Sequence, residues 1–285
     1  MSTLQFTAPF VGAEWLKAHL NDDALVLLDA SWYLPADNRN TQAEFEQQHI
    51  PGARFFDIDS IADPSSGLPH TLPTPDRFAE ALQSLGITEG HTVVVYDSAG
   101  LLSAPRAWWM FRVFGWERVA VLKGGLPAWL RLGGDTASGL VESVSAPGLA
   151  LPFRAELFAD QNDVITATDT GDRQILDARS PGRFSGAEPE PRPGLASGHM
   201  PTAINLPFGT LIDHECGELL PAEQLRQVLA TQGVDLDRPT ITSCGSGITA
   251  CILALALFVL GRESVAVYDG SWTEWGSQQP DRVVR

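Results

Sequence analysis

The chain has 285 residues, enough for one large α/β domain or for two domains of about 140 residues each. Its 35 acidic residues outnumber its 19 basic residues, and the formal net charge of −16 argues against nucleic acid or an anionic membrane as the main partner. The longest apolar run, residues 248–260, is shorter than the ~18–20 residues that a membrane-spanning helix needs.

The first residues of the chain and its cysteines indicate the cellular compartment of the protein. Residues 1–5 lack the basic and apolar segments of a secretory signal peptide. Cys216, Cys244 and Cys251 include no CxxC pair, so they suit a reducing compartment better than a disulfide framework or a zinc site. Cys251 lies in an apolar helical stretch, and we expect it to pack in the core. These features predict a cytoplasmic protein with no metal centre.

Short β-rich runs alternate with helical stretches along the chain. In chain order we expect a strand at 24–30, a helix at 77–85, a β-rich run at 92–97, a helix at 104–114, a β-rich run at 119–125, a strand at 174–179, a helix at 222–232, a strand at 239–242, a helix at 250–260 and a β-rich run at 265–271. This alternation predicts an α/β fold, with mostly parallel sheets covered by helices on both faces. Ligands bind such sheets at the carboxyl ends of the strands.

The chain also contains an internal repeat. Four motifs recur in the same order at separations of 146 to 150 residues. The recurring positions are Asp29 and Asp177, His49 and His199, Asp97 and Cys244, and Trp129 and Trp275. Four matches at nearly one separation predict two homologous domains, which we place at residues 1–140 and 155–285. Residues 141–154, rich in small residues and proline, are the expected linker.

The segment 243–250 places a cysteine between an expected strand and an expected helix. Gly245 and Gly247 let the backbone turn so that N–H groups point inward, and the helix start adds the positive end of its dipole. A sulfur at Cys244 would be stabilised there as thiolate, the nucleophilic form. The alternative is a buried structural cysteine before a loop that needs glycine. Asp97 stands at the same position of the first half, where a carboxylate could hardly replace a structural cysteine, so we interpret Cys244 as a nucleophile.

Taken together, the motifs resemble those of the two-domain rhodanese-like sulfurtransferases over nearly the whole chain. The matching stretches are residues 28–34, 49–53, 55–59 and 103–112 in the first half, and 177–179, 198–201 and 268–272 in the second. The loop after Cys244 is similar to that of the 3-mercaptopyruvate sulfurtransferase branch. Thiosulfate-preferring relatives carry basic residues after the cysteine, whereas Gly245 and Ser246 are neutral here. The resemblance implies tandem rhodanese-like domains, with the second one catalytic.

The resemblance also implies a reaction without a cofactor. The Cys244 thiolate would take sulfur from 3-mercaptopyruvate as a persulfide, release pyruvate, and pass the sulfur to cyanide, a small thiol or a thioredoxin-like dithiol. Arg183 and Arg192 match the positions that bind the donor carboxylate, and a guanidinium binds a carboxylate through two parallel hydrogen bonds.

Further residues receive roles from the same resemblance. The loop residues implied in substrate binding are Gly245, Gly247, Ile248 and Thr249. Ser246 would stabilise the departing enolate together with loop N–H groups. Asp59 and His70, from the first half, match a pair that this branch brings to that serine.

Each of these residues also has a structural interpretation. The two arginines could be surface residues that pair with Glu188 and Glu190. Asp59 could be a helix N-cap, His70 an ordinary loop histidine and Ser246 a small turn residue.

Three other functions compete with 3-mercaptopyruvate sulfur transfer. A cysteine-dependent phosphatase would close the loop with an arginine on the oxyanion, but Ala250 stands at that position and the loop has no basic residue. A non-catalytic binding or sulfur-relay module would share most of the sequence features. A preference for thiosulfate as donor is the nearest alternative within the family.

Overall fold

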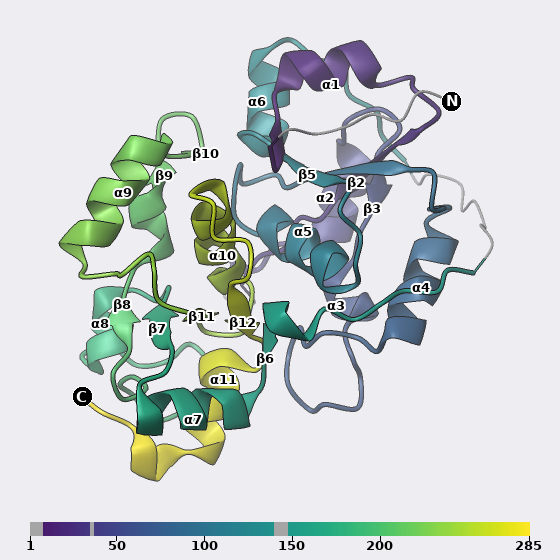
Figure 1. Ribbon diagram of the computed structural model, residues 1–285. Helices are drawn as coiled ribbons and strands as arrows, with labels where there is room; N and C mark the ends of the chain where they lie inside the picture. The colour runs from purple at the N-terminus through teal and green to yellow at the C-terminus, as the bar shows by residue number, and fades with distance from the viewer. Residues whose placement is uncertain (1–7, 35–36, 140–147) are drawn as a thin grey trace. The chain divides into compact units, whose positions relative to one another are not determined.

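The computed structural model describes residues 8–34, 37–139 and 148–285 (Figure 1). The chain divides into two compact units. Unit 1 falls within Met1–Asp63, Pro73–Arg154 and His214–Glu218, and unit 2 within Pro64–Leu72, Ala155–Asp213 and Leu219–Arg285. The start of the chain at 1–5 and the first half of the expected linker, 141–147, lie outside the described residues. The predicted domain boundaries stay a prediction.

Unit 1 is built on a parallel sheet. In the described part of the chain this sheet has five strands in the order β1-β5-β4-β2-β3, and every pair is parallel. The central strand β4 is buried along its whole length, as expected for a strand covered on both faces. The elements of unit 1 are β1 (Phe10–Val11), α1 (Ala13–His19), β2 (Leu25–Asp29), α2 (Thr41–Gln47), β3 (Arg54–Phe55), α3 (Ile58–Ile61), α4 (Pro75–Ser84), β4 (Thr92–Tyr96), α5 (Ala104–Val113), β5 (Val119–Leu122) and α6 (Gly125–Arg131).

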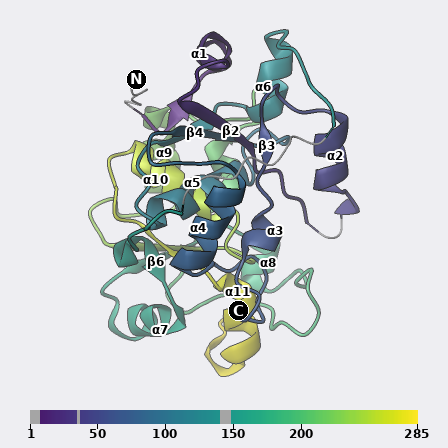
Figure 2. The same cartoon turned by 90° about the vertical axis from the view of Figure 1, so that its right-hand side faces the viewer.

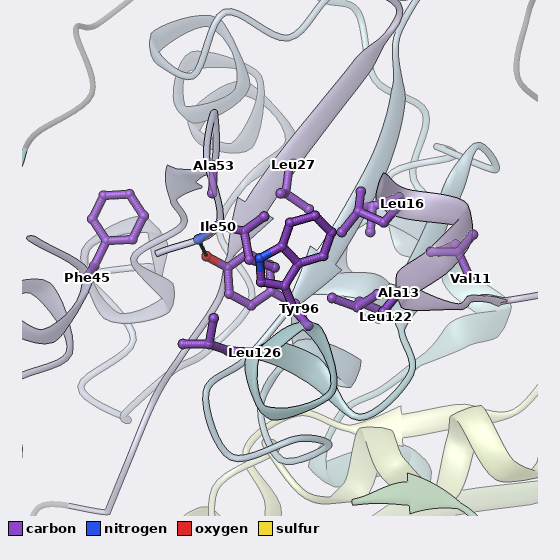
Figure 3. Packing of buried hydrophobic residues seen from close by; sticks show 13 residues of the cluster. Val11, Ala13, Leu16, Leu27, Phe45, Ile50, Ala53, Tyr96, Leu122 and Leu126 are labelled. Atoms are coloured by element: carbon purple, nitrogen blue, oxygen red, sulfur yellow. Dashed lines mark hydrogen bonds between the residues drawn. The ribbon is translucent and has the colours of Figure 1, made fainter. Parts of the chain in front are cut away.

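One face of this sheet packs against α1, α2 and α6 (Figure 3). Tyr96 of β4 lies in this cluster with Leu16, Leu27 and Leu126, all buried. The Tyr96 hydroxyl accepts a hydrogen bond of 3.2 Å from the Ile50 N–H, which satisfies its polar end inside the core. Burial of each large apolar side chain contributes about 1.5–3 kcal/mol to folding.

The opposite face is covered by α4 and α5, which lie side by side in Figure 2. Phe78 of α4 stacks on Phe114 with ring centroids 4.5 Å apart and meets Phe111 of α5 edge-on at 5.4 Å. Every residue of α5 is buried. A helix that is buried on all sides needs no polar face, and the expected helix at 104–114 is confirmed.

Unit 2 repeats the same sheet. Its five described strands follow the order β6-β12-β11-β7-β8, again with parallel pairs, so the two sheets have one topology. Helices α7 and α11 pack in the core cluster on one face, and α10 contacts β11 and β12. The elements are η2 (Ala155–Leu157), β6 (Phe158–Ala159), α7 (Gln161–Thr170), β7 (Gln174–Asp177), α8 (Pro181–Ser185), β8 (Ile204–Asn205), η3 (Phe208–Leu211), β9 (Ile212–Asp213), β10 (Glu218–Leu219), α9 (Ala222–Thr231), β11 (Thr240–Ser243), α10 (Ala250–Val259), β12 (Ala266–Tyr268), α11 (Ser271–Gln278) and η4 (Pro280–Arg282).

The internal repeat is visible in side-chain detail. The His49 ring stacks on Phe45 with centroids 4.1 Å apart, and its Nδ1 lies 2.7 Å from the Phe45 carbonyl oxygen. In unit 2 the His199 ring stacks on Phe184 at 4.0 Å, and its Nδ1 lies 3.0 Å from the Phe184 carbonyl oxygen. The predicted α/β fold with two related parallel sheets is therefore confirmed. Among the described residues, no helix is long and apolar enough to cross a membrane.

The loop after β4, Ser98–Ser103, is organised by one carboxylate. Asp97 is 1% exposed. Its Oδ2 accepts hydrogen bonds from the N–H groups of Leu102, Ser103 and Ala104 at 2.8–2.9 Å, and its Oδ1 accepts one from Ala99 at 3.0 Å. The loop backbone in unit 1 thus surrounds a side-chain carboxylate, a geometry typical of anion-binding nests.

We expect Asp97→Ala to destabilise the full chain by about 3–5 kcal/mol, because several buried N–H groups would lose a charged acceptor at once. Asp97→Asn keeps the size and one acceptor oxygen, so it should lose less. Urea unfolding measures both. A loss below about 1 kcal/mol for the alanine variant would mean that the loop does not depend on this carboxylate.

Candidate active site

Cys244 lies at the carboxyl end of β11, a strand between β7 and β12, and six residues before the start of α10. The residue is 2% exposed. The N–H of Gly247 donates to its Sγ over 3.1 Å, and Gly247 adopts a left-handed φ of +83° that glycine accepts without strain. The loop therefore turns back on the sulfur, as the sequence predicts.

The start of α11 holds this loop from the other side. Trp272 N–H donates to the Cys244 carbonyl over 3.0 Å, and the Thr273 N–H and hydroxyl both donate to the Gly245 carbonyl, over 2.9 and 2.7 Å. The Ser271 hydroxyl accepts the Cys244 N–H at 3.2 Å and donates to the Tyr268 carbonyl at 2.8 Å. The backbone on both sides of the sulfur is thereby fixed.

Ser271 adopts a φ of +49°, a left-handed conformation that is unfavourable for a residue with a side chain. Gly125 occupies the same place in the repeat, at the start of α6, with a φ of +53°. There the N–H of Leu126 donates to the Asp97 carbonyl over 3.0 Å, just as Trp272 does to Cys244. Ser271 in unit 2 is thus in a strained backbone conformation that a glycine would adopt without strain. Its hydroxyl, which glycine lacks, accepts the hydrogen bond from the Cys244 N–H.

A buried ion network lies beside the loop. Arg179 is bound by both carboxylate oxygens of Asp177, with Nη2 2.6 Å from Oδ2, and its guanidinium lies 3.9 Å above the Trp272 ring. Its Nη1 donates to Glu190 over 2.8 Å. Burial alone would lower the pKa of Arg179, but the charges of Asp177 and Glu190 outweigh it and raise this pKa. The guanidinium therefore stays charged inside the protein.

Glu190 extends the network to Arg183. The Arg183 Nη2 lies 2.5 Å from Glu190 Oε2, and the Glu190 side chain is only 2% exposed. The same nitrogen lies against the Cys244 loop, since a Cβ added to Gly245 would come within 2.9 Å of Arg183 Nη2. Arg183 therefore forms an ion pair and lies against the loop at the same time.

His70 meets the second arginine. Arg192 Nη2 lies 3.2 Å from His70 Nε2, and because a guanidinium only donates, the ring nitrogen accepts. His70 is 7% exposed and adopts a left-handed φ of +62°. Its segment, Pro64–Leu72, belongs to unit 2, where the Leu72 N–H donates to Asp269 over 2.7 Å. Strained backbone of this kind is frequent at functional sites.

Asp59 lies in unit 1, within α3. The Trp32 Nε1–H donates to its Oδ2 over 3.1 Å. The N-cap of α3 is Asp57, whose side chain accepts from the Asp59 and Ser60 N–H groups, so the interpretation of Asp59 as a helix cap is wrong. The pairing of Asp59 with His70 and Ser246 stays a prediction.

The remaining predicted residues line the loop itself. Ser246 and Ile248 are 4% and 2% exposed, and Thr249 is the N-cap of α10. Cys251 is fully buried, as expected, and its thiol donates to the Gly247 carbonyl over 3.3 Å. That bond fixes the same glycine whose N–H reaches Cys244.

Comparison with known proteins identifies the family of this chain. The family model described as "Rhodanese-like domain" matches residues 12–132 and again residues 160–278. This chain belongs to the rhodanese-like family. The rhodanese-like fold predicted from the motifs is confirmed.

Individual relatives cover almost the whole chain. The 3-mercaptopyruvate sulfurtransferase of Escherichia coli K12 is 43% identical over 95% of this chain and 96% of its own length. A thiosulfate/3-mercaptopyruvate sulfurtransferase of Arabidopsis thaliana, named as mitochondrial, is 43% identical over 99% of this chain and 79% of its own length. The crystal structure of SseA from Escherichia coli, described as a 3-mercaptopyruvate sulfotransferase, superposes with a TM-score of 0.85 at 41% identity over 93% of this chain and 99% of its own.

Sequence reasoning missed two residues of this rhodanese-like site. The sequence suggests Glu190 only as a surface partner for arginine, whereas in the structure its buried carboxylate bridges two arginines. Ser271 was not singled out. The repeat offered a signal for it, because Gly125 in the first half aligns with a serine in the second.

Ser271→Gly should leave the chain about 1 kcal/mol more stable than Ser271→Ala, since both lose the hydroxyl bonds but only glycine relieves the left-handed strain. This reverses the usual order of the two residues within a helix. Urea unfolding of both variants and the wild type gives the comparison. An alanine variant as stable as the glycine variant would contradict the strain at this position.

Proposed function

We propose that this chain transfers sulfur from 3-mercaptopyruvate to an acceptor through a persulfide on Cys244. The supporting observation is the combination at one sheet edge of a buried thiol, an N–H group directed at its sulfur, and a guanidinium against the same loop. Relatives named 3-mercaptopyruvate sulfurtransferase, at about two-fifths identity over nearly the full chain, support the same donor.

The first step forms the persulfide. The Cys244 thiolate attacks the donor sulfur, the bond between that sulfur and the donor's C3 breaks, and its electron pair remains on carbon as the pyruvate enolate. The donor thiol proton then reaches the enolate carbon and gives pyruvate. In the second step cyanide or a thiol attacks the outer sulfur, the S–S bond breaks and the Cys244 thiolate returns. Donor and acceptor supply all the electrons.

The arginines bind the donor carboxylate in this proposal. Arg183 uses two of its nitrogens for Glu190, and a guanidinium has five N–H donors, so it keeps further N–H groups for a ligand. Arg192 lies beside His70, which places His70 next to the bound carboxylate. We assign Ser246 and the loop N–H groups to the enolate, with Asp59 and His70 as its partners.

The loop in unit 1 supports the anion-binding role. The Asp97 loop directs four N–H groups at one carboxylate, and the Cys244 loop follows the equivalent strand of the repeat. In the catalytic copy such groups would stabilise the persulfide and the enolate, whose charges arise only during the reaction. Gly245, Gly247, Ile248 and Thr249 supply this backbone.

Thiosulfate is a second candidate donor, because the Arabidopsis relative carries both donors in its name. The neutral Gly245 and Ser246 favour 3-mercaptopyruvate in this chain. The ratio of kcat/KM for the two donors, with cyanide as the common acceptor, decides between them. The classes of acceptor (cyanide, a small thiol or a thioredoxin-like dithiol) and the cytoplasmic location stay predictions from the sequence.

Cys244 should gain one sulfur atom when 3-mercaptopyruvate is added without an acceptor, because its sulfur alone follows the strand end and receives the Gly247 N–H. Peptide mass spectra locate the added sulfur. Cys244→Ser should abolish transfer and keep the fold, while Cys216→Ser serves as the matched control. Added sulfur on Cys216 or Cys251 instead would contradict the assignment.

Arg183→Ala and Arg192→Ala should each lower kcat/KM for 3-mercaptopyruvate about ten- to a hundredfold, the equivalent of roughly 1.5–3 kcal/mol for a charge-assisted bond to carboxylate. Arg183→Ala leaves Glu190 paired with Arg179, so the fold should persist. Arg226→Ala, at an arginine of α9 that is 51% exposed, is the control. A wild-type kcat/KM in both site variants would rule out the binding of the donor carboxylate by Arg183 and Arg192.

A further inference from the structure

Glu190 is the one acidic residue that joins the two arginines of the buried network described above. Its Oε1 accepts from Arg179 Nη1 at 2.8 Å and from Arg183 Nε at 3.3 Å, and its Oε2 accepts from Arg183 Nη2 at 2.5 Å. Its side chain is 2% exposed. Glu188, two residues earlier, is exposed and accepts from the Ser180 hydroxyl. The two glutamates therefore offer a matched pair of positions.

The charges in this network can be assigned to pairs. Asp177 binds Arg179 through both of its oxygens and neutralises it. The carboxylate of Glu190 is then the counter-charge of Arg183. The four side chains together carry no net charge, although Arg183 still presents hydrogen-bond donors at Gly245.

Two more charged site residues lie in unit 2. Arg192 contributes one positive charge, and the thiolate of Cys244 contributes one negative charge in its reactive form. The charges of these six unit 2 residues sum to zero. A donor with one negative charge can use the oriented N–H groups, while a second negative charge would gain no net attraction and would cost more to remove from water.

We propose that Glu190 makes the site select a sulfur donor with one negative charge over a donor with two. Glu190 holds Arg183 against the Cys244 loop, where Arg183 can donate hydrogen bonds, and at the same time cancels the positive charge of Arg183. This inference rests on the proposed function and adds a specificity-determining residue to it. Glu190 acts through Arg183 and is a positioning residue.

The charge argument predicts a change in ratio. Removing the negative charge of Glu190 makes the net charge of these unit 2 residues more positive by one, and the added attraction grows with the charge of the ligand. The dianion thiosulfate should therefore gain more than 3-mercaptopyruvate. In Glu190→Gln we expect the ratio of kcat/KM for thiosulfate to that for 3-mercaptopyruvate to rise about tenfold. A ratio measured within one preparation does not depend on the amount of folded enzyme.

Three variants of the full chain separate charge from geometry. Glu190→Gln removes the charge and keeps an acceptor oxygen. Glu190→Asp keeps the negative charge on a side chain that is one methylene shorter. It should lower kcat/KM for both donors and keep the wild-type ratio of the two values. Glu188→Gln removes an exposed charge from the same loop and should also keep that ratio. Cyanide is the acceptor in every assay, and thiocyanate is the product measured.

A binding measurement provides a readout apart from turnover. Oxamate and oxalate have the same number of heavy atoms but carry one and two negative charges, and both are tested as inhibitors competing with 3-mercaptopyruvate. In Glu190→Gln the relative affinity should move toward oxalate about tenfold. If wild type binds oxalate more than about tenfold tighter than oxamate, the inference is wrong even where no variant folds.

The outcomes distinguish this inference from the proposed function. An unchanged donor ratio in Glu190→Gln, with a wild type that uses 3-mercaptopyruvate through Cys244, overturns the role of Glu190 alone. An equal shift in Glu190→Asp would assign the effect to geometry and overturn the charge argument. A wild type that takes no sulfur from 3-mercaptopyruvate overturns both.

Discussion

The loop that follows the central strand of each sheet can direct its N–H groups at only one acceptor, and the chemistry of each copy depends on what that acceptor is. In unit 1 the acceptor is the Asp97 carboxylate, which is bound by four N–H groups. In unit 2 the strand ends in Cys244, whose sulfur receives the Gly247 N–H. The loop N–H groups are therefore occupied by a side-chain carboxylate in the first copy. In the second copy they are available to negative charges that develop during a reaction.

The same comparison locates strain in the catalytic copy. Both loops receive an N–H from the helix after the last strand, from Leu126 in one copy and Trp272 in the other. The preceding residue has a positive φ in each, but it is glycine at 125 and serine at 271. With His70, unit 2 thus holds two side-chain-bearing residues of its site in left-handed conformations, each costing about 1–3 kcal/mol. Surrounding hydrogen bonds keep them there, so stability is reduced where the nucleophile is positioned.

Local signals in the sequence were sufficient for most of the fold and for the nucleophile. The expected helices at 104–114 and 250–260 differ from the structure by one residue at their ends. They could be predicted because apolar periodicity and a glycine at the helix end are local features of the sequence. The Cys244 loop followed from its glycines. What the sequence could not give depends on distant segments meeting. Arg192 and His70 are 122 residues apart in the chain, and no local pattern indicates their contact.

Arg183 illustrates why the two interpretations of a site arginine are not exclusive. From the sequence, an ion pair with a glutamate and a grip on a donor carboxylate were alternatives. The structure has the ion pair, yet the same guanidinium lies against Gly245. A buried ion pair contributes little net stability, so the effects of Glu190 that matter for function are the position and the charge balance of Arg183. A guanidinium already held in place loses less conformational entropy when a donor binds, and the carboxylate site is organised before the donor arrives.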